Sequence, residues 1–170
     1  MTQALTLGLD LGGTKVLGVA LSERGEVVAE CRRPTPRGEE ALIDALGAVA
    51  EELCRTTSGV GEVTAVGVGA PGLVDRDGML RAAPNLPGVD QLPLRASLES
   101  RLGLPVRAEN DATCAAWGEH QLGAARGKEH VVVATLGTGI GGGIITDGRL
   151  YRGANGFAGE IGRASCRERV

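Results

Sequence analysis

The sequence predicts an α/β fold organised as two lobes, and three observations support it. In the middle of the chain, apolar β-branched runs alternate with segments of helical periodicity. A glycine-containing segment lies between two apolar runs twice, at 10–15 and again at 137–143. Small and charged residues at 123–128 separate these two regions, as a hinge between domains does. We therefore expect a first lobe over 1–122 and the start of a second lobe over 123–160.

Composition excludes several kinds of partner. With 170 residues, of which 42% are hydrophobic, the chain can bury one sizeable core. The net charge is −3 and no cationic run is present, so a nucleic-acid partner is not expected. The sequence contains only three aromatic residues of the Phe, Tyr and Trp types, Trp117, Tyr151 and Phe157. This scarcity also argues against a surface on which nucleic-acid bases stack.

The chain shows no targeting signal, and its cysteines suit a reducing compartment. No basic segment followed by an apolar stretch opens the sequence, and glycines interrupt the apolar run 131–145, which would make a poor membrane helix. The four cysteines are scattered and form no close pair. We therefore expect a cytoplasmic protein with no membrane partner.

The first glycine segment predicts a phosphate-holding turn. Adjacent Gly12 and Gly13 carry no Cβ, so their backbone N–H groups can come close to an anion. The apolar, β-branched run 16–21 follows the turn, whereas a helix follows the glycines of a Walker or dinucleotide loop. The sequence therefore predicts a hairpin of strands 5–9 and 16–21, with Asp10 at its tip. A third antiparallel strand is expected at 26–32.

Apolar periodicity and the positions of glycine and proline predict the helices and strands in the middle of the chain. The segment 39–55 places its leucines and valines on one helical face and is expected to cover the sheet. A buried strand at 63–68, helices at 92–102 and 112–122, and a short strand at 106–108 complete the first lobe. Prolines in 84–88 predict a rigid loop there.

The second glycine segment repeats the first. Strands are expected at 131–136 and 144–146 on either side of 137–143. Thr14 and Thr138 each stand beside glycines, and two such turns are what a bilobal nucleotide clamp needs. Each turn alone could equally be an ordinary hairpin turn. The second also matches a dinucleotide-binding pattern, but a strand rather than a helix follows it, which disfavours that interpretation.

Six motifs in order resemble the ROK family of sugar kinases and sugar-responsive repressors. They span residues 5–160 and comprise 10–15, Ala70-Pro71-Gly72, Pro84-Asn85, Asn110-Asp111, 136–143 and Gly159-Glu160. The resemblance implies the actin-like, ribonuclease H-like ATPase fold of the hexokinase superfamily, in which two lobes close on ATP and a sugar.

The resemblance also implies roles for named residues. Asp10 is expected near Mg²⁺, through water, and Asp111 as the general base that takes the proton of a sugar hydroxyl. The helix that follows Asp111 favours its ionised form, although Asp111 could be a plain N-cap. The implied ATP-phosphate contacts are Asp10, Gly12, Gly13, Thr14, Lys15, Thr135, Gly137, Thr138, Gly139 and Gly141. The implied sugar contacts are Gly72, Asn85, Asn110, Asp111 and Glu160, for which turn, capping and solvated positions are the alternatives.

The last ten residues depart from the family pattern. The family places a histidine after Gly159-Glu160-Ile161-Gly162, where this chain has Arg163. Residues 161–170 can be encoded by a common sequencing-adapter string, so we expect them to be a non-native tail. On that hypothesis the chain alone should have negligible kinase activity and should expose apolar surface. A structural zinc segment of the parent protein would then lie outside this sequence.

The leading functional hypothesis is an ATP- and Mg²⁺-dependent, glucokinase-like kinase acting on a hexose or amino-hexose hydroxyl. The resemblance implies a homodimer for the full-length parent. A sugar-sensing transcriptional regulator that lacks its DNA-binding domain is an alternative. Such a regulator is expected to carry a helix-turn-helix before the first glycine turn, where this sequence has few residues, so the kinase is favoured. A non-catalytic actin-like ATPase is a third class, and it gives no reason for Asn85 together with Asn110-Asp111.

Overall fold

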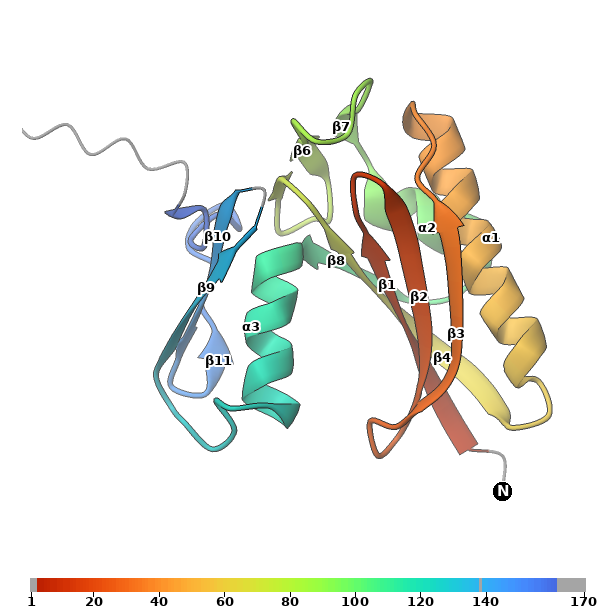
Figure 1. The fold of residues 1–170 in the computed structure, drawn as a ribbon, viewed down its shortest axis with the longest axis horizontal. Helices are drawn as coiled ribbons and strands as arrows, with labels where there is room; N and C mark the ends of the chain where they lie inside the picture. Colours follow the sequence, from red (N-terminus) through yellow and green to blue (C-terminus); the bar gives the residue numbers. More distant parts are fainter. Residues whose placement is uncertain (1–2, 138, 162–170) are drawn as a thin grey trace, which may run out of the picture. The chain divides into compact units, whose positions relative to one another are not determined.

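The computed structural model describes residues 3–137 and 139–161, which form two compact units (Figure 1). The division falls between Asp111 and Ala112, one helix earlier than the predicted hinge at 123–128. No helix in the described part of the chain has both the length and the hydropathy needed to cross a bilayer.

A five-stranded sheet forms the centre of the first unit. Its strands lie in the order β3-β2-β1-β4-β8. The predicted antiparallel run of β1, β2 and β3 is confirmed, and β4 and β8 add to it in parallel with β1. The strands are β1 (Gln3–Leu11), β2 (Lys15–Ser22), β3 (Val27–Pro34), β4 (Gly61–Ala70) and β8 (Val106–Asn110).

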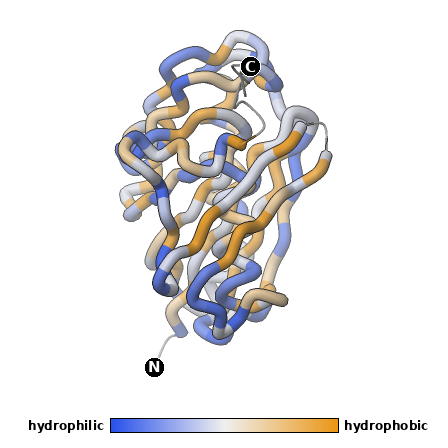
Figure 2. Tube along the Cα trace, turned by 90° about the vertical axis from the view of Figure 1, so that its left-hand side faces the viewer, coloured by the Kyte–Doolittle hydropathy of each residue, from blue (hydrophilic) through white to orange (hydrophobic). Residues whose placement is uncertain are grey.

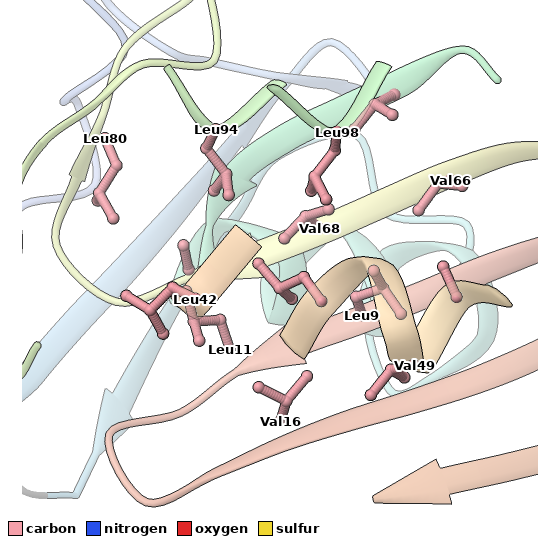
Figure 3. Packing of buried hydrophobic residues seen from close by; sticks show 14 of the residues in the cluster. Leu9, Leu11, Val16, Leu42, Val49, Val66, Val68, Leu80, Leu94 and Leu98 are labelled. Carbon is pink, nitrogen blue, oxygen red and sulfur yellow. The ribbon is translucent and has the colours of Figure 1, made fainter. Parts of the chain in front are cut away.

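Two helices, α1 (Glu39–Thr57) and α2 (Leu94–Leu102), pack against this sheet (Figure 1). Alternate residues of β1 point toward them, because successive side chains of a strand face opposite sides. Figure 3 shows the resulting core, in which α1 and α2 bring leucines and valines onto β1, β2 and β4. The helices at 39–55 and 92–102 are therefore confirmed within two residues at each end, and their apolar faces do cover the sheet.

α1 can approach β2 closely because β2 carries a glycine. A Cβ on Gly18 would lie 2.3 Å from Cγ1 of Val49 and 2.9 Å from Cδ1 of Leu53. Real Cβ atoms do not come so near a neighbour, so the helix packs directly on the backbone here.

A second, small sheet of order β5-β6-β7 was not predicted. Its strands, β5 (Leu73–Val74), β6 (Leu80–Ala82) and β7 (Asp90–Leu92), are too short to show a period-two pattern. The Arg81 guanidinium holds the sheet together, donating to Asp75 Oδ2 at 2.7 Å and to Gln91 Oε1 at 2.8 Å. The burial of Asp75 opposes its ionisation. Hydrogen bonds from Met79 N–H, Arg81 and Asp77 N–H outweigh this and lower its pKa.

The loop between β6 and β7 is the predicted rigid loop that carries Asn85. Leu86 and Val89 anchor it in the core of the first unit, with 3% and 9% of their surface exposed. The amide N–H of Leu86 donates to Ala83 O at 2.9 Å, which closes a turn. The loop is therefore held by packing as well as by its prolines.

The second unit contains the helix α3 (Asp111–Leu122), which starts at the division, and a sheet of order β11-β10-β9. Its strands are β9 (Val131–Leu136), β10 (Ile140–Thr146) and β11 (Arg149–Leu150). β10 starts four residues earlier than the predicted 144. The reason is packing, because Cβ atoms on Gly141 and Gly143 would lie 2.7 Å and 2.3 Å from the Cβ atoms of Ala112 and Ala116. α3 thus packs on this sheet, which explains why the division falls at the start of the helix.

The face of the second sheet that is turned away from α3 is apolar. Val132, Leu136 and Ile140 are 71%, 82% and 57% exposed, respectively. Figure 2 shows the hydrophobic stretches along β9 and β10. The prediction that this chain exposes apolar surface in its second part is confirmed.

The contact of Gly18 with α1 predicts that replacing this glycine with alanine destabilises the fold. Gly18→Ala should lower the free energy of unfolding by about 2 kcal/mol and the Tm by about 5 °C, because the new methyl group overpacks the core. Gly67→Ala is the matched control, since its Cβ would meet no atom nearer than Leu7 O at 3.8 Å. Thermal unfolding of both variants checks this, and equal Tm values for the two would contradict the packing described.

Candidate active site

The carboxyl ends of three parallel strands meet at one edge of the first sheet. Gly69 of β4 is the register partner of both Asp10 of β1 and Glu109 of β8. Asn110 ends β8 and Asp111 follows at once as the first residue of α3. In open α/β sheets, ligands bind at this edge of the parallel strands. Asp10, Asn110 and Asp111 therefore lie at the same edge of the sheet, while the roles that the resemblance implies for them stay predictions.

The prediction that Asp10 lies at the tip of the hairpin was wrong. Asp10 belongs to β1 and pairs with Leu17, and the ladder continues for one more pair, Leu11 with Val16. The turn itself consists of the three residues 12–14. The strand extends further than expected because Leu11, only 1% exposed, is part of the core.

Two carboxylates interact at this edge. Partial burial raises the pKa of Asp10, and the negative charge of Asp111 raises it further, while Lys15 opposes both effects. A cation placed beside these groups would relieve the repulsion. Magnesium commonly binds through one or two carboxylates and completes its shell with water and phosphate oxygens. Among residues 3–137 and 139–161, no group of three or more His, Cys, Asp or Glu side chains is placed to hold a metal ion.

The glycine turn lies against the loop that carries Asn85. A Cβ on Gly13 would lie 3.2 Å from the backbone oxygen of Asn85, and one on Gly12 would lie 3.0 Å from Lys15 O. The Gly12 N–H donates to Lys15 O at 2.9 Å, and Thr14 and Lys15 are exposed. The predicted phosphate turn and the predicted sugar loop are therefore neighbours in the first unit.

Asn110 and Gly72 are joined by a hydrogen bond. The side-chain amide of Asn110 donates to Gly72 O at 3.1 Å. Gly72 has a φ of 109°, and a Cβ there would lie 2.2 Å from Ala82 O, so its backbone conformation and its contact with β6 both require glycine. Of the predicted sugar contacts, Gly72, Asn85, Asn110 and Asp111 lie in the first unit.

The remaining predicted site residues belong to the second unit. Thr135 and Gly141 are register partners in β9 and β10, and Gly137 N–H donates to Gly139 O at 3.0 Å across the turn. Glu160 N–H donates to Phe157 O, and a Cβ on the neighbouring Gly159 would lie 2.1 Å from Gly142 O. Thr138 lies outside the described residues, as does the predicted tail beyond Ile161. The phosphate roles expected in this unit stay predictions for Thr135, Gly137, Gly139 and Gly141. At Gly141, the close packing against Ala112 is by itself enough to require glycine.

Sequence reasoning missed Thr35, which contacts the first glycine turn. Its hydroxyl donates to Gly12 O at 2.7 Å, although 23 residues separate the two. From the sequence alone, Pro34 and Pro36 indicate only that the third strand ends. A hydroxyl residue held between two prolines was the available signal.

The mixed sheet, its antiparallel glycine hairpin and the carboxylates at its carboxyl edge define an actin-like ATPase fold. The ROK family model matches residues 6–168, and the chain belongs to the ROK family. The resemblance inferred from the six motifs is thereby confirmed.

Relatives and solved structures support this assignment. A glucokinase of Streptomyces coelicolor is 44% identical over 160 residues, covering 93% of this chain and 49% of that protein. An N-acetyl-D-glucosamine kinase of Vibrio parahaemolyticus is 39% identical over 156 residues, covering 91% and 51%. The crystal structure of a ROK family glucokinase from Streptomyces griseus in complex with glucose and AMPPNP has a TM-score of 0.85 and 42% identity, covering 94% of this chain and 50% of that one. The chain thus spans about half the length of the curated relatives that it matches.

The repulsion between Asp10 and Asp111 predicts a stability effect. Because the folded state raises the Asp10 pKa, its contribution is fully present below the pKa of the unfolded chain and is lost as the pH rises through the folded pKa. At neutral pH, Asp10→Asn should therefore raise the Tm, by only about 2 °C because solvent screens this partly exposed group. The gain should disappear below about pH 3.9, where the wild-type carboxyl is also neutral.

Thermal unfolding between pH 3 and pH 8 measures this difference. Asp77→Asn, which neutralises an exposed carboxylate in the β5–β6 turn, is the control and should stay within about 0.5 kcal/mol of the wild type. A lower Tm for Asp10→Asn at neutral pH would show that the two carboxylates do not oppose each other.

Proposed function

We propose that this chain carries the general base and the first phosphate turn of an ATP- and Mg²⁺-dependent kinase of hexoses or amino-hexoses. The observation that carries the proposal is the placement of two carboxylates, Asp10 and Asp111, at the carboxyl edge of the sheet, where the charge of Asp111 raises the pKa of Asp10. The glycine turn begins two residues after Asp10, on the same strand connection. The names of the relatives, a glucokinase and an N-acetyl-D-glucosamine kinase, support sugars as the class of substrate.

Phosphoryl transfer requires positioning and charge neutralisation more than covalent help from the protein. Asp10 would hold Mg²⁺ through water, and the ion when bound supplies positive charge beside the phosphate oxygens. Asp111 would accept the proton of the attacking hydroxyl as its oxygen bonds to the γ-phosphorus of ATP and the bond from that phosphorus to the oxygen of the departing ADP breaks, since a carboxylate within hydrogen-bond reach serves as a general base. Backbone N–H groups of the turn at Gly12 and Gly13 would hold phosphate oxygens.

The sugar would bind beside this turn. Asn85 offers an amide that can both donate to and accept from hydroxyl groups, and its loop is anchored by buried Leu86. Asn110 is buried, and its amide is already oriented by Gly72 O. Glu160 of the second unit would accept two further hydroxyl bonds. Side chains whose orientation is held by the surrounding chain suit the recognition of a polyol whose hydroxyls have fixed directions.

Replacing Asp111 tests the assignment of the base. In the whole protein, Asp111→Asn should lower kcat by about 10²- to 10⁴-fold and change the KM for the sugar little, because the amide keeps the shape but cannot take the proton. A coupled assay of ADP formation with glucose, mannose and N-acetylglucosamine measures this. Asp77→Asn is the control and should keep the wild-type kcat.

Other outcomes would identify a different class of protein. ATP hydrolysis that no sugar stimulates, and that Asp111→Asn leaves unchanged, would indicate an actin-like ATPase without a sugar substrate. Sugar-dependent binding to DNA, with no ADP formed, would indicate a transcriptional regulator.

A further inference from the structure

Thr35 makes two hydrogen bonds to the first glycine turn. Its hydroxyl donates to Gly12 O at 2.7 Å, and its backbone N–H donates to Thr14 O at 3.0 Å. Thr35 directly follows β3, and Pro34 of β3 pairs with Lys15 of β2 in the last step of the ladder. Thr35 thus binds the carbonyl groups of the two residues on either side of Gly13, which are Gly12 and Thr14.

The bond to the Gly12 carbonyl determines where the turn directs the N–H group of Gly13, and the bond to the Thr14 carbonyl holds the other side of Gly13 in place. Within a planar trans peptide, the C=O and the N–H point in opposite directions. Since the carbonyl of Gly12 points toward Thr35, the N–H of Gly13 points away from it. The N–H groups of Gly13 and Thr14 donate to no acceptor within the described part of the chain, whereas Gly12 N–H is already used by Lys15 O.

The flanking prolines prepare Thr35 for this role. Pro36 disfavours the helical region for the residue before it, so Thr35 is biased toward an extended backbone before any ligand arrives. Pro34 restricts φ on the other side. The bonds to the turn therefore cost less conformational entropy than they would in a freely flexible segment.

We propose that Thr35 is a positioning residue of the phosphate turn, holding Gly12 and Thr14 so that the free N–H group of Gly13 is presented to the phosphates of ATP. This inference rests on the proposed function of the turn. Thr35 itself does not touch the nucleotide and acts through the two carbonyls that it binds.

A threonine elsewhere in the same sheet provides a matched control. Thr64 Oγ1 donates to Leu5 O at 3.2 Å, which is the same kind of bond, from a hydroxyl to a carbonyl of the β1 region. Leu5 lies near the start of β1, at the end opposite the glycine turn. Thr64→Val and Thr35→Val remove the same group and should destabilise the fold by similar amounts, but only the second should affect nucleotide binding.

Steady-state kinetics of the whole protein test the proposal. Thr35→Val should raise the KM for ATP about fivefold, as expected for one lost hydrogen bond, and should leave the KM for glucose within about twofold. Thr35→Ser, which restores the hydroxyl, should recover the wild-type KM for ATP. Thr64→Val should change neither KM.

Three results would overturn the proposal: an unchanged KM for ATP in Thr35→Val, a failure of Thr35→Ser to restore it, or equal changes in both KM values. A wild-type protein that forms no ADP in response to sugar would instead refute the proposed function, and with it ATP as the ligand of this turn. Hydrogen exchange of residues 12–16 without nucleotide separates the two failures. Exchange should be faster in Thr35→Val than in Thr64→Val, and equal rates would show that Thr35 does not hold the turn.

Discussion

The parallel pairing of β1 with β4, and of β4 with β8, is the constraint on which the rest of the site depends. Each pairing sets a register, and together they bring Asp10, Gly69 and Glu109 level across three strands that are far apart in sequence. Asp111 leaves β8 two residues later and begins a helix. A slip of one residue in either pair would turn every side chain of that strand to the other face. The buried leucines of β1 prevent such a slip, so the hydrophobic core also positions the acidic groups.

Glycine serves two purposes in this chain, and only the structure separates them. Gly18, Gly141 and Gly143 lie where a helix packs directly on a strand, and a Cβ there would collide with its side chains. Gly72 has a positive φ and touches the backbone of β6. By contrast, Gly12 and Gly13 form an exposed turn whose shape is held from outside by Thr35. The same residue type thus permits close packing in the cores and a tight turn at the sheet edge.

The site combines mutual repulsion with rigid support. The charge of Asp111 works against ionisation of Asp10, which is unfavourable for folding but favourable for attracting a cation. The segments around these two carboxylates are held in place by packing and hydrogen bonds. The Asn85 loop is anchored by Leu86, the flanking small sheet is held by Arg81, and the amide of Asn110 is bonded to Gly72. Strain concentrated in a few polar groups and balanced by a well-packed surround is typical of functional sites.

The sequence by itself determined the class of fold, the two strand-turn-strand units, the helices of the first unit and the family. Those features depend on local signals, namely apolar periodicity, the positions of glycine and proline between apolar runs, and the order of the six motifs along the chain. The short strands β5 to β7 escaped prediction because three residues cannot show a period. The sequence predicted Asp10 in the turn, whereas it belongs to the preceding strand β1. Where a strand ends depends on the strands and helices that pack against it, which a local pattern does not reveal.

Tertiary structure alone decided which groups meet. That Thr35 bonds Gly12, that Gly13 touches the Asn85 loop and that the division falls at the start of α3 all involve partners remote in sequence. Local propensity contains no information about such pairs, because they form only when sheet register and helix packing bring the segments together. The individual site residues could therefore be nominated from the sequence, whereas their arrangement around the glycine turn required the folded chain.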